Sequence, residues 1–395
     1  MVKFDTLRRT FLAWRTAART ALTLAALWTL PAAAQETGVL LAGDAFDAAP
    51  GALHGTPSGT GWSEPWVTQN GDLSVPGYNV ATAAPLSYRN LVTAGGYATG
   101  GKSYLTAYRG FDKTAAGPFA DYLAGGAIGA AGKTVWLSAL LRLDANNNDE
   151  RSFSVYTNFF NDNLVAAGYF GTPSNDGATR YWSLKLGASV YRTGVPVVVG
   201  QTALLVVKIT FGAPGNATLY VNPTALGGAE PAAASAEAVA AGSLAFKGLA
   251  FYGGTQPGLG SLDEVRVGTT FAAVTPAVAD NEAPSAVADL AAPTVTDKSV
   301  RLTWGAATDN VRVDGYDVYN GTTLLGTTAA LEFNVTGLAA ATAYTFTVKA
   351  KDGAGNQSTP ATVNVTTKSA VKFTVQGTKI LDPNGNEFLI KGANV

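Results

Sequence analysis

Apolar and polar residues alternate in short runs along most of this chain. In Thr134–Leu143 an apolar side chain falls at every second position, and Ser152–Phe159 alternates in the same way. A period of two predicts strands with one buried face. Further runs are separated by Gly, Asn, Asp or Pro clusters: Tyr181–Leu186, Leu204–Phe211, Ala217–Asn222, Leu244–Tyr252 and Leu262–Val267. These short strands predict an all-β, two-sheet sandwich over residues 35–276. Within it, Pro231 and the flanking glycines favour a loop for the alanine-rich stretch Ala229–Ala241.

A second and shorter set of strands follows the linker 277–284. Its runs are Val300–Trp304, Gly315–Tyr319, Leu331–Val335 and Tyr344–Ala350, and the stretch DGAGNQS at Asp352–Ser358 is typical of a hairpin turn. The pattern predicts a second sandwich over residues 285–369, of about ninety residues.

Residues 370–395 predict a short β-hairpin. Two extended runs, Lys379–Asp382 and Glu387–Lys391, flank Pro383-Asn384-Gly385-Asn386, in which Gly385 supplies the positive φ of a tight reversal. The hairpin would place Phe388 and Ile390 on one face. A two-stranded hairpin is marginally stable by itself, so we interpret this stretch as the opening of a further domain.

Residues 1–34 carry the features of a secretory signal peptide. A basic region precedes the short apolar run Ala21–Leu30, and Ala32-Ala33-Ala34 offers small residues for cleavage before Gln35. The run is shorter than the about 20 residues that span a bilayer. We therefore expect a secreted, extracellular protein whose mature chain begins at Gln35 and has no membrane segment.

Composition excludes several kinds of partner and site. The chain has no cysteine, so it has neither disulfides nor thiolate metal sites. Its net charge is −1, with 14% charged residues, which gives no electrostatic reason to expect nucleic acid or an anionic membrane as a partner. We expect a monomer.

Three stretches of the first region resemble bacterial domains of the concanavalin A-like, laminin G-like superfamily. They are GTGWSEPW near its start, LLVVKITFGAPGNATLYVNP in its middle and SLDEVRVGTTFAAVTP at its end. The resemblance implies a large jelly-roll sandwich. Domains of this superfamily bind sugars, adhere to surfaces or cleave glucans, so the fold alone does not decide the role.

The other two regions carry resemblances of their own. Residues 285–369 resemble a seven-strand fibronectin type III domain, which implies packing roles for Trp304, Leu338 and Tyr344. The pattern F-x-V-x-G-x-x-I-x-D-x-x-G-x-x-F-x-x-x-G-x-N in 371–395 resembles the N-terminal hairpin of cellulase-like and mannanase-like glycoside hydrolases of family 5. For a longer parent protein this implies a retaining mechanism with two glutamates. Neither glutamate is in this sequence, so no catalytic residue is named.

Aromatic side chains are the candidate ligand-binding groups, because the apolar face of a sugar stacks on a ring while its hydroxyls take polar partners. Six of them crowd the first third of the large sandwich: Trp62, Trp66, Tyr78, Tyr88, Tyr104 and Tyr108. We expect the partner to be a polysaccharide or a cell-surface glycan.

Several other motifs match a functional pattern only in part. Gly96–Ser103 satisfies the phosphate-loop pattern, yet the residues after it predict a strand instead of the required helix. The acidic pairs Asp149-Glu150 and Asp263-Glu264 do not place two carboxylates on one strand face, so we interpret them as a solvated turn and a strand end. Asp144–Glu150 is rich in oxygen ligands and is a candidate calcium loop, but we favour a plain hairpin turn, because Asn and Asp are common in turns. His54 stands alone. We expect no other cofactor.

Two functions are consistent with these patterns. The first is a non-catalytic pair of targeting and spacer modules belonging to a secreted polysaccharide-degrading glycoside hydrolase, whose catalytic barrel lies outside this sequence. The second is an extracellular adhesin or matrix protein with no enzymatic domain.

Overall fold

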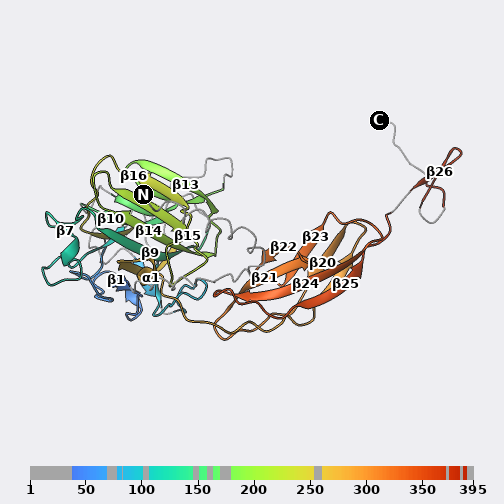
Figure 1. The fold of residues 1–395 in the computed structure, drawn as a ribbon, viewed down its shortest axis with the longest axis horizontal. Helices are drawn as coiled ribbons and strands as arrows, with labels where there is room; N and C mark the ends of the chain where they lie inside the picture. Colours follow the sequence, from blue (N-terminus) through green and yellow to red (C-terminus); the bar gives the residue numbers. More distant parts are fainter. Residues whose placement is uncertain are drawn as a thin grey trace, which may run out of the picture. The chain divides into compact units, whose positions relative to one another are not determined.

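The computed structural model describes residues 38–68, 78–81, 83–100, 106–145, 151–157, 163–169, 179–252, 260–370, 373–382 and 386–388. The predicted signal peptide, at 1–34, lies outside them. Strands dominate these ranges (Figure 1), and their helical turns are the short α1 (Phe271–Val274) and η1 (Ala120–Tyr122). The all-β prediction is confirmed. No helix in the described ranges is both long enough and apolar enough to cross a membrane.

Two antiparallel sheets form the first sandwich. The nine-stranded sheet runs in the order β16 (Ala236–Val239), β15 (Asn216–Val221), β14 (Thr202–Thr210), β9 (Thr134–Leu143), β18 (Gly260–Gly268), β5 (Tyr97–Gly100), β4 (Tyr78–Ala81), β2 (Gly51–Ala52), with β1 (Leu40–Asp44) also paired to β18. The seven-stranded sheet runs β13 (Ser189–Pro196), β12 (Tyr181–Leu186), β11 (Asn163–Tyr169), β10 (Arg151–Tyr156), β17 (Gly248–Tyr252), β6 (Thr106–Gly110), β3 (Val67–Thr68). A separate short pair joins β7 (Leu123–Ala124) to β8 (Ala127–Ile128).

The seven runs predicted in this region all appear as strands, with ends shifted by a few residues. The exception to the prediction is the alanine-rich stretch. Its last part forms β16, which pairs with β15 and is the edge of the nine-stranded sheet. Pairing with a neighbouring strand overrides the weak local preference of alanine here.

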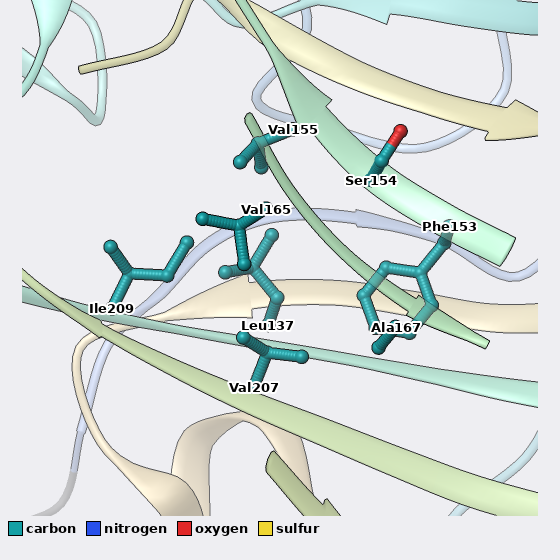
Figure 2. Close-up of a pocket in the computed structure, with 8 residues that line it drawn as sticks. All are labelled: Leu137, Phe153, Ser154, Val155, Val165, Ala167, Val207 and Ile209. Carbon is teal, nitrogen blue, oxygen red and sulfur yellow. The ribbon is translucent and has the colours of Figure 1, made fainter. Parts of the chain in front are cut away.

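The inner faces of the two sheets enclose one apolar core. Alternate residues of β9, β10 and β14 point into it, as the period of two predicted. Figure 2 shows the facing side chains of Leu137, Val165 and Val207 around a residual gap of about 10 Å³, while the hydroxyl of Ser154 points away from them. A gap of this size has room for about one water molecule, so the interior has no ligand cavity here.

A second apolar cluster covers the outer face of the nine-stranded sheet. Trp136 and Leu140 of β9 point to this side, and the turn α1 packs on them through Phe271 and Val274. The side chains of Leu86 and Leu91 belong to the same cluster. This sheet is therefore covered by apolar side chains on both faces.

The later strands form a smaller sandwich of three and four strands. One sheet has the order β19 (Ala291–Val295), β20 (Ser299–Thr303), β23 (Glu332–Thr336), and the other has β22 (Thr323–Thr328), β21 (Val313–Asn320), β24 (Ala343–Asp352), β25 (Ala361–Thr366). Trp304 is in its core, and Leu338 and Tyr344 pack against it. The hydroxyl of Tyr344 accepts a hydrogen bond from the backbone N–H of Ala339 (2.9 Å), so all three predicted packing roles are confirmed.

The C-terminal stretch contains one more reversal than predicted. β26 (Thr374–Gln376) pairs with β27 (Lys379–Leu381), and Gly377 has a positive φ of 60° in the turn between them. A bridge from Leu381 to Glu387 supports the second reversal around Asn386. Phe388 is 48% exposed, as its predicted face implied, whereas Ile390 lies outside the described residues.

Candidate functional site

The outer face of the seven-stranded sheet is the one sheet face of the first sandwich that neither apolar cluster covers in the described ranges. Phe153 and Val155 of β10 point into the core, so Ser152, Ser154 and Tyr156 point outward. The strand registers place outward residues side by side in rows across the sheet. The candidate site lies in these rows.

Two rows cross the middle of this face. One is Tyr108, Ala250, Ser154, Ala166, Lys185 and Val190, and the other is Thr106, Tyr252, Ser152, Gly168, Ser183 and Arg192. Their central members are small and buried, with Ser154 only 1% exposed. The larger side chains that reach solvent lie toward the two ends of the rows: they are aromatic on β6 and β17, and cationic on β12 and β13, where Val190 is exposed as well.

The third row gathers the functional groups of the face. It runs Gly110, Gly248, Tyr156, and its two glycines make room for side chains that lie over them. A carbon added at Gly248 would lie 2.3 Å from the hydroxyl of Tyr156, and one added at Gly110 would lie 2.9 Å from the Oε1 of Glu64. Tyr108 contacts Tyr156 edge to face, with ring centroids 6.2 Å apart.

These three groups share one electrostatic environment. Burial raises the pKa of Tyr108 and of Tyr156, and the negative charge of Glu64 raises both pKa values further. Both phenols therefore stay protonated at neutral pH and can donate as well as accept hydrogen bonds. Tyr156 is only 3% exposed, so the groups that a sugar could reach at this place are the Tyr108 ring and the partly exposed carboxylate of Glu64. We name Glu64, Tyr108 and Tyr156 the tyrosine–glutamate site.

Sequence reasoning singled out Tyr108, noted Tyr156 only as an aromatic residue of a later strand, and did not indicate Glu64. The signal for Tyr156 was present, because the alternation in Ser152–Phe159 places it opposite the apolar positions of its strand. Nothing in the sequence reveals that Glu64, distant in the chain, reaches the same place.

Trp62 and Trp66, two of the predicted ligand-binding residues, belong to a buried ionic network. Asp44 and Arg109 form an ion pair at 2.8 Å, and both side chains are at most 3% exposed. The indole N–H of Trp66 donates to the Oδ2 of Asp44 (2.7 Å), and the hydroxyl of Ser58 donates to the same carboxylate (2.9 Å). The guanidinium lies over the Trp62 ring, 5.1 Å from its centroid.

The two indole rings of this network differ in their exposure to solvent. Trp66 is 0% exposed, so a ligand cannot reach its ring. Trp62 is partly buried, and its ring stacks on Phe111 with centroids 5.3 Å apart. The physical reason is the cost of a buried charge: Asp44 and Arg109 need hydrogen-bonding and aromatic partners, and the two tryptophans supply them.

The remaining predicted aromatics do not gather with Tyr108. Tyr78 is 1% exposed and packs on Phe251 in the core, with ring centroids 4.7 Å apart. Tyr88 packs against the apolar cluster on the other sheet, and its hydroxyl donates to the backbone carbonyl of Pro223 (3.0 Å). Tyr104 lies outside the described residues. Ligand contact at Trp62, Tyr88, Tyr104 and Tyr108 stays a prediction.

The acidic pair Asp263-Glu264 is neither solvated nor at a strand end, which corrects that part of the prediction. Both residues are inside β18 at an irregularity of its register, Glu264 has φ of 51°, and their exposures are 0% and 2%. Asp263 accepts from the backbone N–H of Leu86 (2.8 Å), and Glu264 is ion-paired with Arg266 and accepts from Ala94. The pair fastens the segment 86–94 to the sheet. The other acidic pair considered in the sequence, Asp149-Glu150, lies outside the described residues.

The phosphate-loop pattern and the candidate calcium loop lie only partly within the described residues. The first part of the phosphate-loop pattern is strand β5, and the next described element is strand β6 instead of a helix, as expected for a chance match. Of the calcium loop only the start is described. There Asp144 is ion-paired with Arg142 and accepts a hydrogen bond from Ser261 (2.6 Å). Calcium binding at Asp144–Glu150 stays a prediction. His54, for its part, shares a hydrogen bond with the hydroxyl of Thr68 (3.1 Å).

Comparison with protein families identifies the smaller sandwich. Residues 283–366 match the model of the fibronectin type III domain. This part of the chain is a fibronectin type III domain. The concanavalin A-like assignment of the first sandwich and the family 5 assignment of the tail stay predictions.

The similar curated proteins are named as polysaccharide-degrading enzymes. Chitinase A1 of Niallia circulans is 50% identical over 98 residues, which are 25% of this chain and 14% of that protein. Exoglucanase A of Cellulomonas fimi is 57% identical over 81 residues, or 20% of this chain and 9% of that protein. Chitinase Chi52 of Paenibacillus xylanexedens is 45% identical over 112 residues, or 28% and 20%. The matches thus span at most a fifth of these relatives.

Replacing Arg109 should destabilise the first sandwich strongly. Arg109→Met leaves the Asp44 carboxylate buried without its counter-charge, and the loss of one partner of a buried pair costs about 3–5 kcal/mol. The matched control is Arg301→Met, whose pair with Glu332 is about half exposed on both sides and is expected to cost less than about 1 kcal/mol. Amide hydrogen exchange in urea measures both effects. Equal destabilisation by the two variants would contradict the assignment.

Asp263 should make the first sandwich less stable as pH rises. Burial, followed by the charge of Glu264, raises its pKa from 3.8 to about 8. Between these two pKa values the folded state holds a proton on Asp263 that the unfolded state lacks. The contribution of Asp263 to stability is therefore fully present below about pH 4 and is lost as pH rises through about 8. Asp263→Asn should flatten this slope in urea unfolding at several pH values, and Asp121→Asn, at an exposed site, should leave it unchanged. A slope that Asp263→Asn does not alter would refute this.

Proposed function

We propose that this chain provides the substrate-targeting and spacer modules of a secreted polysaccharide-degrading glycoside hydrolase. The observation that carries the proposal is the fibronectin type III domain, whose relatives at about half identity are named chitinases and an exoglucanase. In this proposal the first sandwich binds the polysaccharide, and the fibronectin domain separates it from the catalytic part.

The tyrosine–glutamate site is the proposed contact with the glycan. The Tyr108 ring offers an apolar surface for a pyranose, while the carboxylate of Glu64 accepts hydrogen bonds from its hydroxyl groups. The Tyr156 ring supports Tyr108 from the side through their edge-to-face contact.

We propose that the catalytic barrel follows residues 371–395. The resemblance of this stretch to family 5 hydrolases supports the arrangement, and so does its exposed apolar surface. Phe373 and Phe388 contact each other, with ring centroids 5.0 Å apart, yet they are 51% and 48% exposed. A barrel packed on these rings would cover them.

The first sandwich should bind insoluble glycans through the tyrosine–glutamate site. We expect dissociation constants of about millimolar to micromolar, because a small polar site gains only a few kcal/mol net. Tyr108→Ala should weaken retention on chitin, cellulose, mannan or xylan about five- to tenfold, since an aromatic contact contributes about 0.5–1.5 kcal/mol. Pull-down with the purified chain measures this.

Two variants control for folding and for location. Tyr108→Phe keeps the ring and should retain most of the binding. Tyr191→Ala removes another exposed tyrosine of the same sheet, from the opposite face, and should have no effect. If the folded chain bound none of these glycans, the adhesin hypothesis would replace the targeting role.

The 395-residue chain should not hydrolyse polysaccharides, whereas a chain extended through the following coding sequence should. Among the described residues of the first sandwich, the buried carboxylates Asp44, Asp263 and Glu264 are held by backbone and arginine contacts. Release of reducing sugar from colloidal chitin, carboxymethylcellulose and mannan compares the two chains. Turnover by the short chain, persisting after removal of residues 371–395, would place a catalytic site in the first sandwich and contradict this proposal.

A further inference from the structure

Three aspartates converge at the end of the fibronectin domain where β21 begins and β24 ends. Asp280 comes from the linker, Asp309 from the loop between β20 and β21, and Asp352 is the last residue of β24. One carboxylate oxygen of each lies within 4.8 Å of the others. The side-chain amide of Asn356 donates to the backbone carbonyl of Asp280 (3.2 Å) and so holds the linker at this place.

Two of these carboxylates keep an oxygen that has no hydrogen-bond partner among the described residues. The Oδ2 of Asp280 and the Oδ1 of Asp309 each expose less than 1 Å² and accept no hydrogen bond. The other oxygen of Asp309 accepts from the backbone N–H groups of Val311 (3.0 Å) and Arg312 (2.7 Å), which fixes the orientation of the carboxylate. An anionic oxygen that is buried and unpaired is strongly unfavourable, so these two atoms indicate a missing partner.

The third carboxylate adds charge without neutralising the cluster. Asp352 is 1% exposed and accepts from the backbone N–H groups of Gly355 (2.7 Å) and Asn356 (2.8 Å). None of the ion pairs in the described ranges includes any of the three aspartates. Even Arg312, close to Asp309 in the chain, directs its guanidinium to Asp314 (3.2 Å). The missing partner is therefore a cation from solution.

We propose that Asp280, Asp309 and Asp352 bind a calcium ion. The donors are all carboxylate oxygens, which favour Ca²⁺ or Mg²⁺ over metals that prefer nitrogen or sulfur ligands. Ligands from three separate segments give an irregular site, which Ca²⁺ accepts more readily than Mg²⁺, since Mg²⁺ requires near-octahedral geometry. This site is distinct from the loop Asp144–Glu150 in the first sandwich.

The ion would fasten the linker to the fibronectin domain. Without it, mutual repulsion of three carboxylates pushes Asp280 away from the domain. The side-chain amides of Asn356 and Asn310, which donate to the backbone carbonyl and the carboxylate of Asp280, oppose that repulsion. With it, the direction in which the linker leaves the domain is fixed. The stiffness of a spacer then depends on the calcium concentration outside the cell.

Calcium titration of the whole chain after treatment with EDTA tests the proposal. We expect one ion to bind to this cluster, with a dissociation constant of about 10⁻⁴–10⁻³ M, the range of extracellular calcium modules. Hydrogen exchange should slow at residues 280–284, 309–312 and 352–356 on addition of CaCl₂, and less so with MgCl₂. Asp309→Asn, which keeps a hydrogen-bonding oxygen but removes a charge, should weaken binding at least tenfold. Asp297→Asn, a carboxylate elsewhere in the same domain, should leave it unchanged.

A second measurement separates an ion site from a purely structural cluster. In EDTA, Asp309→Asn should make the fibronectin domain more stable than the wild type, because it relieves repulsion; in excess calcium the order should reverse. Lower stability of the variant in both conditions would overturn the proposal. So would calcium binding that survives Asp309→Asn and is lost in Asp144→Asn, because the ion would then belong to the first sandwich.

Discussion

A buried ion pair connects the two sheets of the first sandwich. Asp44 belongs to the nine-stranded sheet and Arg109 to the seven-stranded sheet, so their contact fixes one sheet on the other. Burying both charges requires further partners, and the segment around Trp62 and Trp66 folds over the pair to supply them. Arg109 also donates to the backbone carbonyl of Glu64 (2.6 Å). The same interaction that stabilises the core therefore brings the Glu64 carboxylate to the outer face, beside Tyr108.

The two sheets have unequal surroundings, and this inequality decides where a ligand can bind. Apolar side chains cover the nine-stranded sheet on both faces, and the buried pair Asp263-Glu264 fastens the covering segment in place. The outer rows of the seven-stranded sheet instead consist of small polar and aromatic residues. A polar ligand gains nothing at an apolar layer, whereas hydroxyl and carboxylate groups can replace the water that a sugar loses on binding.

Much of the fold could be predicted from the sequence, because a period of two reports which side of a strand is buried. It places Phe153 and Val155 inside and, by implication, Tyr156 outside. The prediction failed where long-range pairing decides the outcome. Trp66 has an aromatic ring on which a sugar could stack, yet its indole N–H donates a hydrogen bond to the buried Asp44. The alternation of β18 gave no sign of the register irregularity that buries Asp263 and Glu264 together. The approach of Glu64 to Tyr108 depends on the contact between two sheets, which no local pattern encodes.

The glycines beneath the tyrosine–glutamate site have a consequence for how this surface can change during evolution. Gly110 and Gly248 are outward positions, separated by the backbone from the inward side chains that fill the core. A Cβ added at Gly248 would lie 2.3 Å from the Tyr156 hydroxyl and 2.4 Å from the backbone carbonyl of Arg109, and the outward residues Ser152, Ser154 and Tyr156 of β10 are at most 3% exposed. Substitution at the two glycines or along β10 would therefore displace packed groups and lower folding stability. Single changes that preserve stability are confined to the partly exposed rim of this face, where Tyr108 lies.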